Sequence, residues 1–186
     1  MRIHVSLITG AALLGALVAS PSMAQQPGAP HAGHATADLA GGYSFLRELP
    51  QDNGDPRDYQ NGWFVSGARQ LFTPHLMVVG EVGGNSRANL VKETQRLLGV
   101  LGGVRYRITR GARLVTFVQG LVGQERFSEP GFSQSGVAFQ PGAGVDMRVA
   151  GPLGVRVQMD YRLAHEDDIT FKELRIAAGG VVWFGR

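Results

Sequence analysis

Alternation of apolar and polar residues is the pattern that recurs along this chain. It is clearest from Val155 to Leu163, where every odd position is apolar and every even position is polar or charged. A period of two residues predicts a β-strand with one apolar face. Beyond residue 36 no long segment has apolar residues at helical spacing, and no uncharged apolar run has the length of a transmembrane helix. Strands are predicted at 37–47, 60–72, 76–85, 95–107, 112–125, 136–149, 153–165 and 171–184.

The connections between these strands fall into two kinds. Tight ones are predicted at 73–75, 108–111 and 150–152, and longer polar ones at 48–59, 86–94, 126–135 and 166–170. Short turns on one rim and long loops on the other are typical of outer-membrane barrels, whose short turns face the periplasm. The predicted fold is therefore all-β, an eight-stranded antiparallel up-and-down transmembrane β-barrel. In this arrangement 52–58, 88–92, 128–134 and 166–168 face outside, and 73–75, 109–111 and 150–152 face the periplasm.

The two faces of the predicted strands differ in charge. By parity the inward face holds Glu81, Arg105, Arg107, Gln119, Glu125, Asp146, Arg148, Arg156, Gln158, Asp160, Arg162 and Arg175. The lipid face holds Val78, Val82, Leu98, Val100, Val104, Tyr106, Leu114, Val118, Val122, Val145, Met147, Val155, Val157, Met159, Tyr161, Leu163, Ile176 and Val182. A soluble lipocalin-like barrel would have the reverse arrangement, apolar inside and polar outside.

The inward charges are the candidate site. An eight-stranded barrel is just wide enough inside for side chains to fill it, so opposite charges there are expected to pair and plug the lumen. The structural lumen charges are predicted to be Glu81, Arg105, Asp146, Arg148, Arg156, Asp160, Arg162 and Arg175. Their three acids face five arginines, a positive surplus that Glu125 or water must offset. Mid-strand glycines such as Gly142 and Gly144 are expected to relieve crowding and to leave room for long side chains.

The N-terminal segment has the form of an export signal. Arg2 precedes an apolar run over residues 8–18, and Ser22-Met23-Ala24 fits the small-x-small rule for cleavage. We expect a signal peptide over 1–24, a disordered leader over 25–36 and the barrel domain over 37–186.

Composition narrows the choice of function. The 18 Lys and Arg against 15 Asp and Glu give a net charge of +3, too even and too dispersed for a nucleic-acid-binding face. The absence of cysteine excludes disulfides, thiolate metal sites and cysteine nucleophiles. A mean hydropathy of −0.03 fits a soluble globule or a transmembrane barrel equally well, so the strand pattern has to decide.

The C-terminal half carries a family resemblance. AFQPGAGVDMRVAGPLGVRVQMDYRL followed by ELRIAAGGVVWFG resembles the small OmpA-like/OmpX-like outer-membrane β-barrel protein family, and GWFVSGA and RLLGVLGGVRYR do so more weakly. The resemblance covers about 150 residues and implies architecture and location rather than chemistry. It implies an outer-membrane protein of a Gram-negative cell, in contact with lipid and lipopolysaccharide and assembled by the barrel-insertion machinery. Such barrels often end on an aromatic residue, whereas here Gly185 and Arg186 follow Phe184.

The sequence gives little support for a catalytic or metal-binding site. Lipid-A deacylase barrels place a histidine two residues before a serine, but His165 is followed by Glu166-Asp167-Asp168 with no serine near it. The pair His31 and His34 lacks a third metal ligand, and 52–58 lacks calcium-loop spacing. We expect no catalytic residue, cofactor or metal. The predicted role is structural, in envelope integrity, or in surface interaction with an unknown ligand; a narrow ion-conducting pore and, with less support, a lipid-A-modifying enzyme stay open.

Overall fold

The computed structural model describes residues 35–50, 56–88, 94–109, 111, 113–166 and 169–185. The predicted signal peptide, the leader up to residue 34 and the histidine pair within it lie outside the described residues. So do the acidic positions Asp52, Asp55, Asp167 and Asp168. Among the described residues there is no helix long and apolar enough to cross a membrane.

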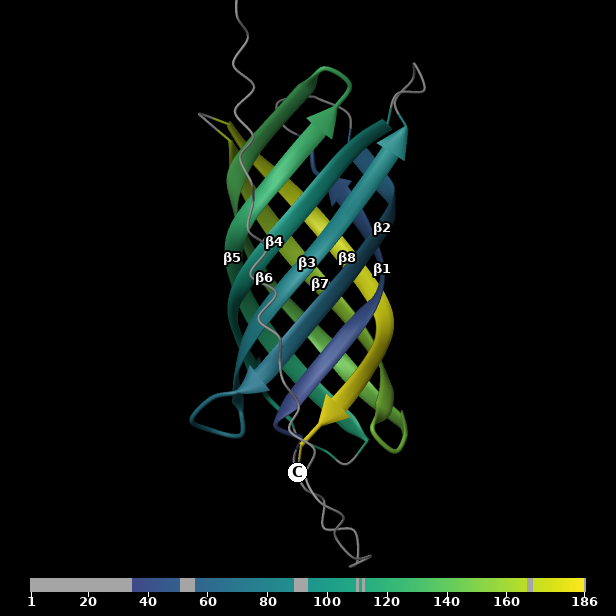
Figure 1. The fold of residues 1–186 in the computed structure, drawn as a ribbon, viewed down its shortest axis with the longest axis vertical. Helices are drawn as coiled ribbons and strands as arrows, with labels where there is room; N and C mark the ends of the chain where they lie inside the picture. The colour runs from purple at the N-terminus through teal and green to yellow at the C-terminus, as the bar shows by residue number, and fades with distance from the viewer. Residues whose placement is uncertain are drawn as a thin grey trace, which may run out of the picture. The chain divides into compact units, whose positions relative to one another are not determined.

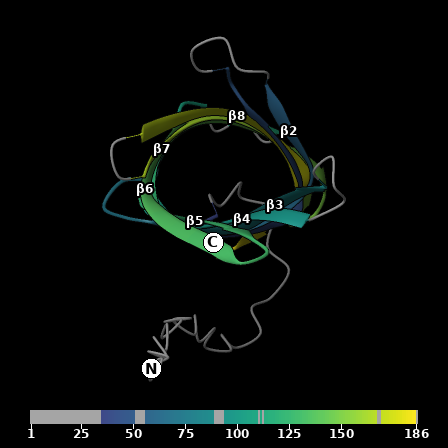
Figure 2. The same ribbon diagram turned by 90° about the horizontal axis from the view of Figure 1, so that it is seen from above.

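Eight antiparallel strands close a barrel in which each strand pairs with its neighbours in sequence (Figures 1 and 2). Pairing of the first strand with the last completes the ring. The strands are β1 (Ala37–Glu48), β2 (Arg57–Gln70), β3 (Leu76–Ala88), β4 (Thr94–Arg107), β5 (Leu114–Glu129), β6 (Phe132–Ala150), β7 (Leu153–Glu166) and β8 (Ile169–Phe184). The predicted fold class is confirmed.

The two ends of the barrel can be told apart by the chain termini. Ala37 at the start of β1 pairs with Phe184 at the end of β8, so the domain begins and ends at one end, here called the terminal end. β2 ends and β3 begins there, as do β4 and β5, and β6 and β7. The other end, here called the loop end, is where β1 ends and β2 begins, and likewise β3 and β4, β5 and β6, and β7 and β8.

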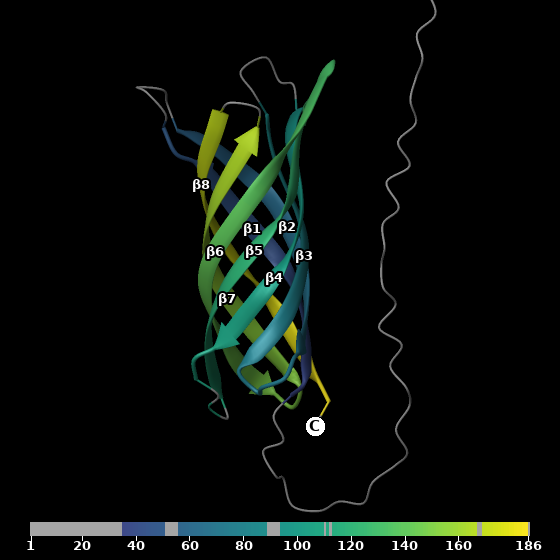
Figure 3. The same ribbon diagram turned by 90° about the vertical axis from the view of Figure 1, so that its left-hand side faces the viewer.

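Two predicted long connections are wrong. In place of a loop over 166–170, β7 and β8 continue to Glu166 and Ile169, which pair with each other. Residues 126–135 do not form a long connection, because β5 and β6 continue to a turn at Pro130 and Gly131, with Ser128 paired to Ser133. The hairpin projects beyond its neighbours (Figure 3). Phe127 and Phe132 hold it together with ring centroids 6.3 Å apart. Serines and a Pro-Gly pair resemble a loop in sequence, but cross-strand contacts keep them in register.

The outer wall of the barrel is an apolar band without charges. Along β7 the outward side chains from Leu153 to Leu163 are all apolar or aromatic, and Val157 and Met159 are about half-exposed. Ten residue intervals of about 3.3 Å, on a strand tilted by about 40°, span roughly 25 Å. Exposed charged side chains of the described strands lie at the two ends of the barrel, as Arg69, Arg96 and Arg126 do. This band matches the height of the apolar belt of outer-membrane barrels.

The lumen is filled by both polar and apolar side chains. β7 contributes four consecutive inward polar residues, Arg156, Gln158, Asp160 and Arg162. A buried apolar cluster comes from β2 to β6 and consists of Ala68, Met77, Val79, Leu101, Leu121 and Ala138. Other strands also carry buried charges, such as Asp38 of β1, Glu81 of β3 and Arg105 of β4, so the charged side chains meet across the lumen.

Candidate functional site

The cluster nearest the terminal end is centred on Asp38. This buried carboxylate of β1 accepts hydrogen bonds from Arg105 Nη1 at 3.2 Å, Arg107 Nη2 at 3.1 Å and Arg156 Nη2 at 3.1 Å. Arg107 also donates to the Ala35 carbonyl oxygen at 2.9 Å. A carboxylate that binds three guanidiniums ties β1 to β4 and β7 across the lumen.

Arg156 is the most heavily bonded side chain of this cluster. Its Nε and Nη2 donate to the two oxygens of Asp146, both at 2.7 Å, in a bidentate pair. The Phe117 ring lies against two guanidiniums, with the Cζ atoms of Arg105 and Arg156 at 4.4 and 5.0 Å from its centroid. The aromatic face and the shared Asp38 together stabilise two like charges that would otherwise repel.

The middle cluster has more carboxylates than guanidiniums, the reverse of the cluster around Asp38. Arg175 Nη1 donates to Glu81 Oε1 at 2.6 Å and to Asp160 Oδ2 at 3.0 Å, so one guanidinium holds two carboxylates. Gln158 Nε2 adds contacts to Glu81 Oε2 at 3.4 Å and Asp160 Oδ2 at 3.1 Å. The Phe64 ring lies 5.3 Å from Arg175 Cζ. The side-chain amide of Gln158 donates the hydrogen bonds that a second arginine would otherwise donate to these two carboxylates.

The cluster nearest the loop end is built on Arg162. Its Nη1 lies 2.6 Å from Glu125 Oε1 and 3.7 Å from Glu173 Oε2. All three side chains are buried. Again two carboxylates share one guanidinium.

Two glutamines join the three clusters into one network. Gln119 accepts from Arg105 Nη2 at 2.9 Å through Oε1 and donates through Nε2 to Asp160 Oδ1 at 3.1 Å. Gln140 accepts from Arg162 Nε at 2.9 Å and donates to Glu81 Oε1 at 3.1 Å. Each amide turns its oxygen to an arginine and its nitrogen to a carboxylate. Hydrogen bonds therefore run without a break from Asp38 to Glu125.

The structure places the predicted lumen charges as follows. Glu81, Arg105, Asp146, Arg156, Asp160, Arg162 and Arg175 are buried and joined in the network. Arg148 differs, because it is exposed at the terminal end with its Cζ 5.0 Å from the Trp183 ring centroid. It lies two positions beyond Asp146, where the lumen opens to solvent, so it is not part of the buried network.

The predicted positive surplus in the lumen is wrong. Sequence reasoning missed two buried acids, Asp38 and Glu173, and the bridging Gln140. The buried carboxylates of the described lumen are Asp38, Glu81, Glu125, Asp146, Asp160 and Glu173, against the guanidiniums of Arg105, Arg107, Arg156, Arg162 and Arg175. Parity could have found both acids, since Asp38 precedes the outward Leu39 and Glu173 shares the face of Arg175.

Two glycines make space for this network. A Cβ on Gly142 would lie 2.0 Å from Asp160 Oδ1, and one on Gly144 would lie 2.4 Å from the Phe117 Cζ atom. Both positions therefore have to stay without a side chain for Asp160 and Phe117 to occupy their sites. The expected role of these glycines in leaving room for larger lumen side chains has this geometric basis.

Candidate chemistry outside the lumen is sparse. His165 Nδ1 lies 2.9 Å from Thr170 Oγ1, so a threonine hydroxyl of the neighbouring strand lies beside this histidine. The pair is exposed on the wall of the barrel. Asp58, from the candidate calcium loop, is bonded to Arg47 at 2.7 Å. In the part of the chain that the structure describes, no group of three or more His, Cys, Asp or Glu residues could hold a metal ion.

Comparison with solved structures identifies the architecture. The barrel is similar to neisserial surface protein A (NspA), with a TM-score of 0.65 and 10% sequence identity over 80% of this chain and 97% of that one. The chain has the fold of a small outer-membrane β-barrel. Ail, the attachment invasion locus protein of Yersinia pestis, is 18% identical over 80% of this chain and 99% of its own. The N-terminal β-barrel domain of Pseudomonas aeruginosa OprF is 12% identical over 80% and 97%; both have TM-scores of 0.49.

This outer-membrane type of barrel is recognised here by its fold and not by sequence. No protein-family model matches the chain, and no curated protein matches it. At 10% identity the likeness to NspA extends to the architecture alone.

Proposed function

We propose that this chain is an integral outer-membrane protein of a Gram-negative cell with a structural or surface-interaction role in the envelope. One observation carries the proposal: an uncharged apolar outer wall encloses a lumen of paired charges. In aqueous solution this outer wall would be a large, continuous apolar surface in contact with water, which is rare in soluble monomeric proteins. In a bilayer the same surface is solvated by lipid, and the closed ring leaves no unpaired strand edge.

Further features support this location. The exposed aromatic side chains of Tyr106 and Phe184 lie near the terminal-end edge of the apolar band, whereas Tyr43 and Trp63 pair with each other in the middle of β1 and β2. Aromatic side chains at the edge of the band are typical of a membrane interface. The export signal predicted over 1–24 and assembly by the barrel-insertion machinery belong to the same proposal.

The lumen is proposed to be closed to ions rather than to conduct them. Arg105, Arg156 and Arg175 are each no more than 1% exposed and reach across the barrel to carboxylates on other strands. An ion would have to displace several charge-assisted hydrogen bonds to pass. The pore hypothesis therefore ranks below the plugged barrel.

Planar-bilayer recordings test this ranking. We expect no steady, large single-channel steps from the wild-type protein. Asp160→Ala is expected to lower the unfolding midpoint, because Arg175 loses one of its two carboxylates, without creating conductance. Large, steady steps from the wild type would instead make the pore the leading function.

An outer groove near the loop end favours contact with lipid headgroups. It is lined by Asn61, Trp63, Gly84, Asn85, Ser86, Arg96, Leu97, Leu98, Arg126 and Ser128. Arg96 and Arg126 are exposed above Leu98, which belongs to the apolar band. Guanidiniums in this position bind phosphate oxygens well. We propose that they contact lipopolysaccharide or lipid phosphates.

The proposed orientation places the loop end outside the cell. The chain has no cysteine, so single cysteines report position without background. We expect a membrane-impermeant maleimide to label Ser133→Cys, next to the 130–131 turn, on intact cells. The matched Pro152→Cys, in the two-residue turn at the terminal end, should be labelled only after lysis. Labelling of Pro152→Cys alone on intact cells would mean that the orientation is the reverse.

A further inference from the structure

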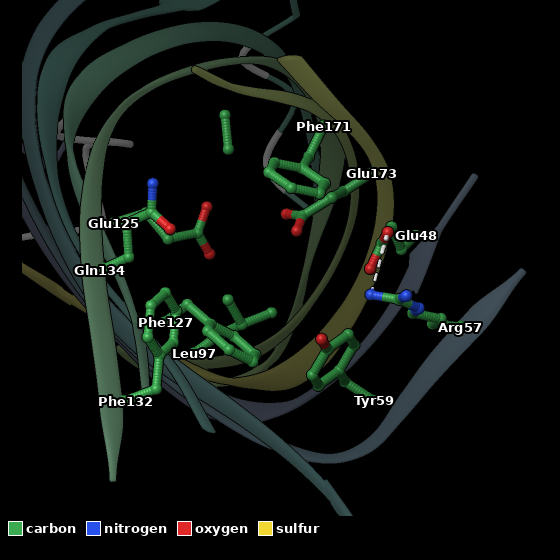
Figure 4. Close-up of a pocket in the computed structure, with 11 residues that line it drawn as sticks. Glu48, Arg57, Tyr59, Leu97, Glu125, Phe127, Phe132, Gln134, Phe171 and Glu173 are labelled. Atoms are coloured by element: carbon green, nitrogen blue, oxygen red, sulfur yellow. Dashed lines mark ion pairs between the residues drawn. The ribbon is translucent and has the colours of Figure 1, made fainter. Parts of the chain in front are cut away.

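A cavity of about 150 Å³ lies inside the barrel near the loop end. Figure 4 shows its lining side chains converging from the strands around it. They are Glu48, Arg57, Tyr59, Leu97, Glu125, Phe127, Phe132, Gln134, Ala164, Phe171 and Glu173. Phe132 is half-exposed, so the cavity adjoins solvent. The lining is mainly apolar and aromatic, with a few charged groups, as in small-molecule sites.

Glu125 presents an unused acceptor to this cavity. Its Oε1 is bonded to Arg162 Nη1 at 2.6 Å, while Oε2 is buried and has no hydrogen-bond partner. The residue is only 1% exposed. In Figure 4 its carboxylate points into the space between the aromatic rings. A buried carboxylate oxygen without a donor is costly, which makes the site selective for a ligand that brings a donor.

The charge around the cavity favours a cation. Arg162 is shared by two buried carboxylates of the lining, Glu125 and Glu173. Arg57 at the rim is half-exposed and pairs with Glu48 and not with Glu125: its Nη1 lies 3.8 Å from Glu48 Oε1 (Figure 4). A positively charged ligand would bring Glu125 Oε2 the hydrogen-bond donor that Arg162 does not supply.

The aromatic rings of the cavity also favour a positively charged ligand. Phe127, Phe132 and Phe171 line the cavity. The ring of Tyr59, which also lines the cavity, makes a cation–π contact with Arg87, whose Cζ lies 5.2 Å from the ring centroid. Ring faces attract ammonium and guanidinium groups and at the same time exclude water from them.

We propose that this cavity binds a small organic cation, an ammonium or guanidinium group on a compact apolar body, with Glu125 Oε2 as its acceptor. The volume suits a body of about the size of benzene, since cavities near 150 Å³ take such molecules. A bare metal ion fits poorly, because aromatic rings in place of oxygen ligands leave its coordination incomplete. This site lies beyond the proposed envelope role and does not depend on it.

Benzylammonium is a suitable probe, with benzyl alcohol and benzoate as neutral and anionic analogues of similar size. The chain is refolded into lipid nanodiscs, and shifts of backbone amide NMR signals around Glu125 and Phe127 are followed during titration. We expect saturable shifts with benzylammonium, binding at least roughly tenfold weaker with benzyl alcohol, and none with benzoate. Equal affinity for the alcohol, or preference for benzoate, would overturn the proposal.

Matched variants locate the site. Glu125→Gln keeps the shape and removes the charge, and is expected to weaken benzylammonium binding by roughly 10- to 100-fold. Glu129→Gln changes the same residue type on the same strand outside the cavity lining, and should bind like the wild type. If Glu125→Gln does not fold, Ala164→Leu fills the cavity while keeping Glu125 and should abolish binding. Unchanged affinity in the folded Glu125→Gln or Ala164→Leu variant would show that the probe binds elsewhere.

Discussion

Replacing Asp38 by alanine is expected to destabilise the barrel by about 3–5 kcal/mol, the largest effect of any single lumen substitution. Asp38 is buried and accepts hydrogen bonds from Arg105, Arg107 and Arg156. Its removal leaves three guanidiniums close together, with Asp146 as the only remaining carboxylate in their cluster. The measurement is equilibrium unfolding by urea of the protein refolded in lipid vesicles.

A surface ion pair provides the control for Asp38→Ala. Arg47 Nε and Asp58 Oδ1 lie 2.7 Å apart, but both side chains are partly exposed at the loop end. Asp58→Ala should leave the free energy of unfolding almost unchanged, because water and salt screen exposed pairs. If Asp38→Ala were as mild as Asp58→Ala, water would have to reach the terminal-end cluster, and the lumen would not be dry.

Introducing arginine at Val157 is expected to cost about 2–4 kcal/mol of stability in a bilayer. Val157 is half-exposed on the outer wall and, with Met159, is one of the two central outward residues between Leu153 and Leu163. A guanidinium there would lie near the centre of the hydrocarbon, where no partner is available among the neighbouring outward side chains. The check is again equilibrium unfolding from lipid vesicles, together with heat-modifiable migration on a gel to report a closed barrel.

Two further arginine substitutions distinguish the effect of membrane depth from general destabilisation of the barrel. Val137→Arg lies outward near the loop end, opposite His165, and should be much milder, because the cost falls toward the interface. Gln158→Arg, one position from Val157, points into the lumen and acts through the contacts of Glu81 and Asp160. Equal tolerance of arginine at Val157 and Val137 would contradict a membrane-spanning wall and favour a soluble barrel.

Much of the fold could be predicted from local pattern. Alternation places Val155, Val157 and Met159 outward and Arg156, Gln158 and Asp160 inward, and the structure has the same arrangement. Strand ends were less predictable. The β5–β6 hairpin extends to Glu129 and Phe132 because pairs such as Ser128 with Ser133 and the contact of Phe127 with Phe132 hold polar residues in register. Such contacts depend on the partner strand and leave no periodic signal in either strand alone.

The partners inside the lumen could not be predicted in the same way. Parity indicates which charges point inward, but Asp38 and Arg156, which are bonded, lie 118 positions apart. Their meeting depends on the stagger between strands when the sheet closes, and that stagger is a property of the whole ring. The roles of Gln119 and Gln140 as bridges follow from the same closure, because neither amide has a carboxylate or a guanidinium fixed beside it by sequence.

The sequence by itself determined the eight strands, the uncharged outer wall and the set of charges that point inward, because side-chain direction in a strand follows from the backbone repeat of two residues. Only the tertiary structure decided which charges pair, that Arg148 lies outside the network, and that Glu125 faces an aromatic cavity. The physical reason is distance along the chain. A local repeat fixes the face of each residue, whereas its height in the lumen relative to residues of other strands is set when β1 pairs with β8 and the ring closes.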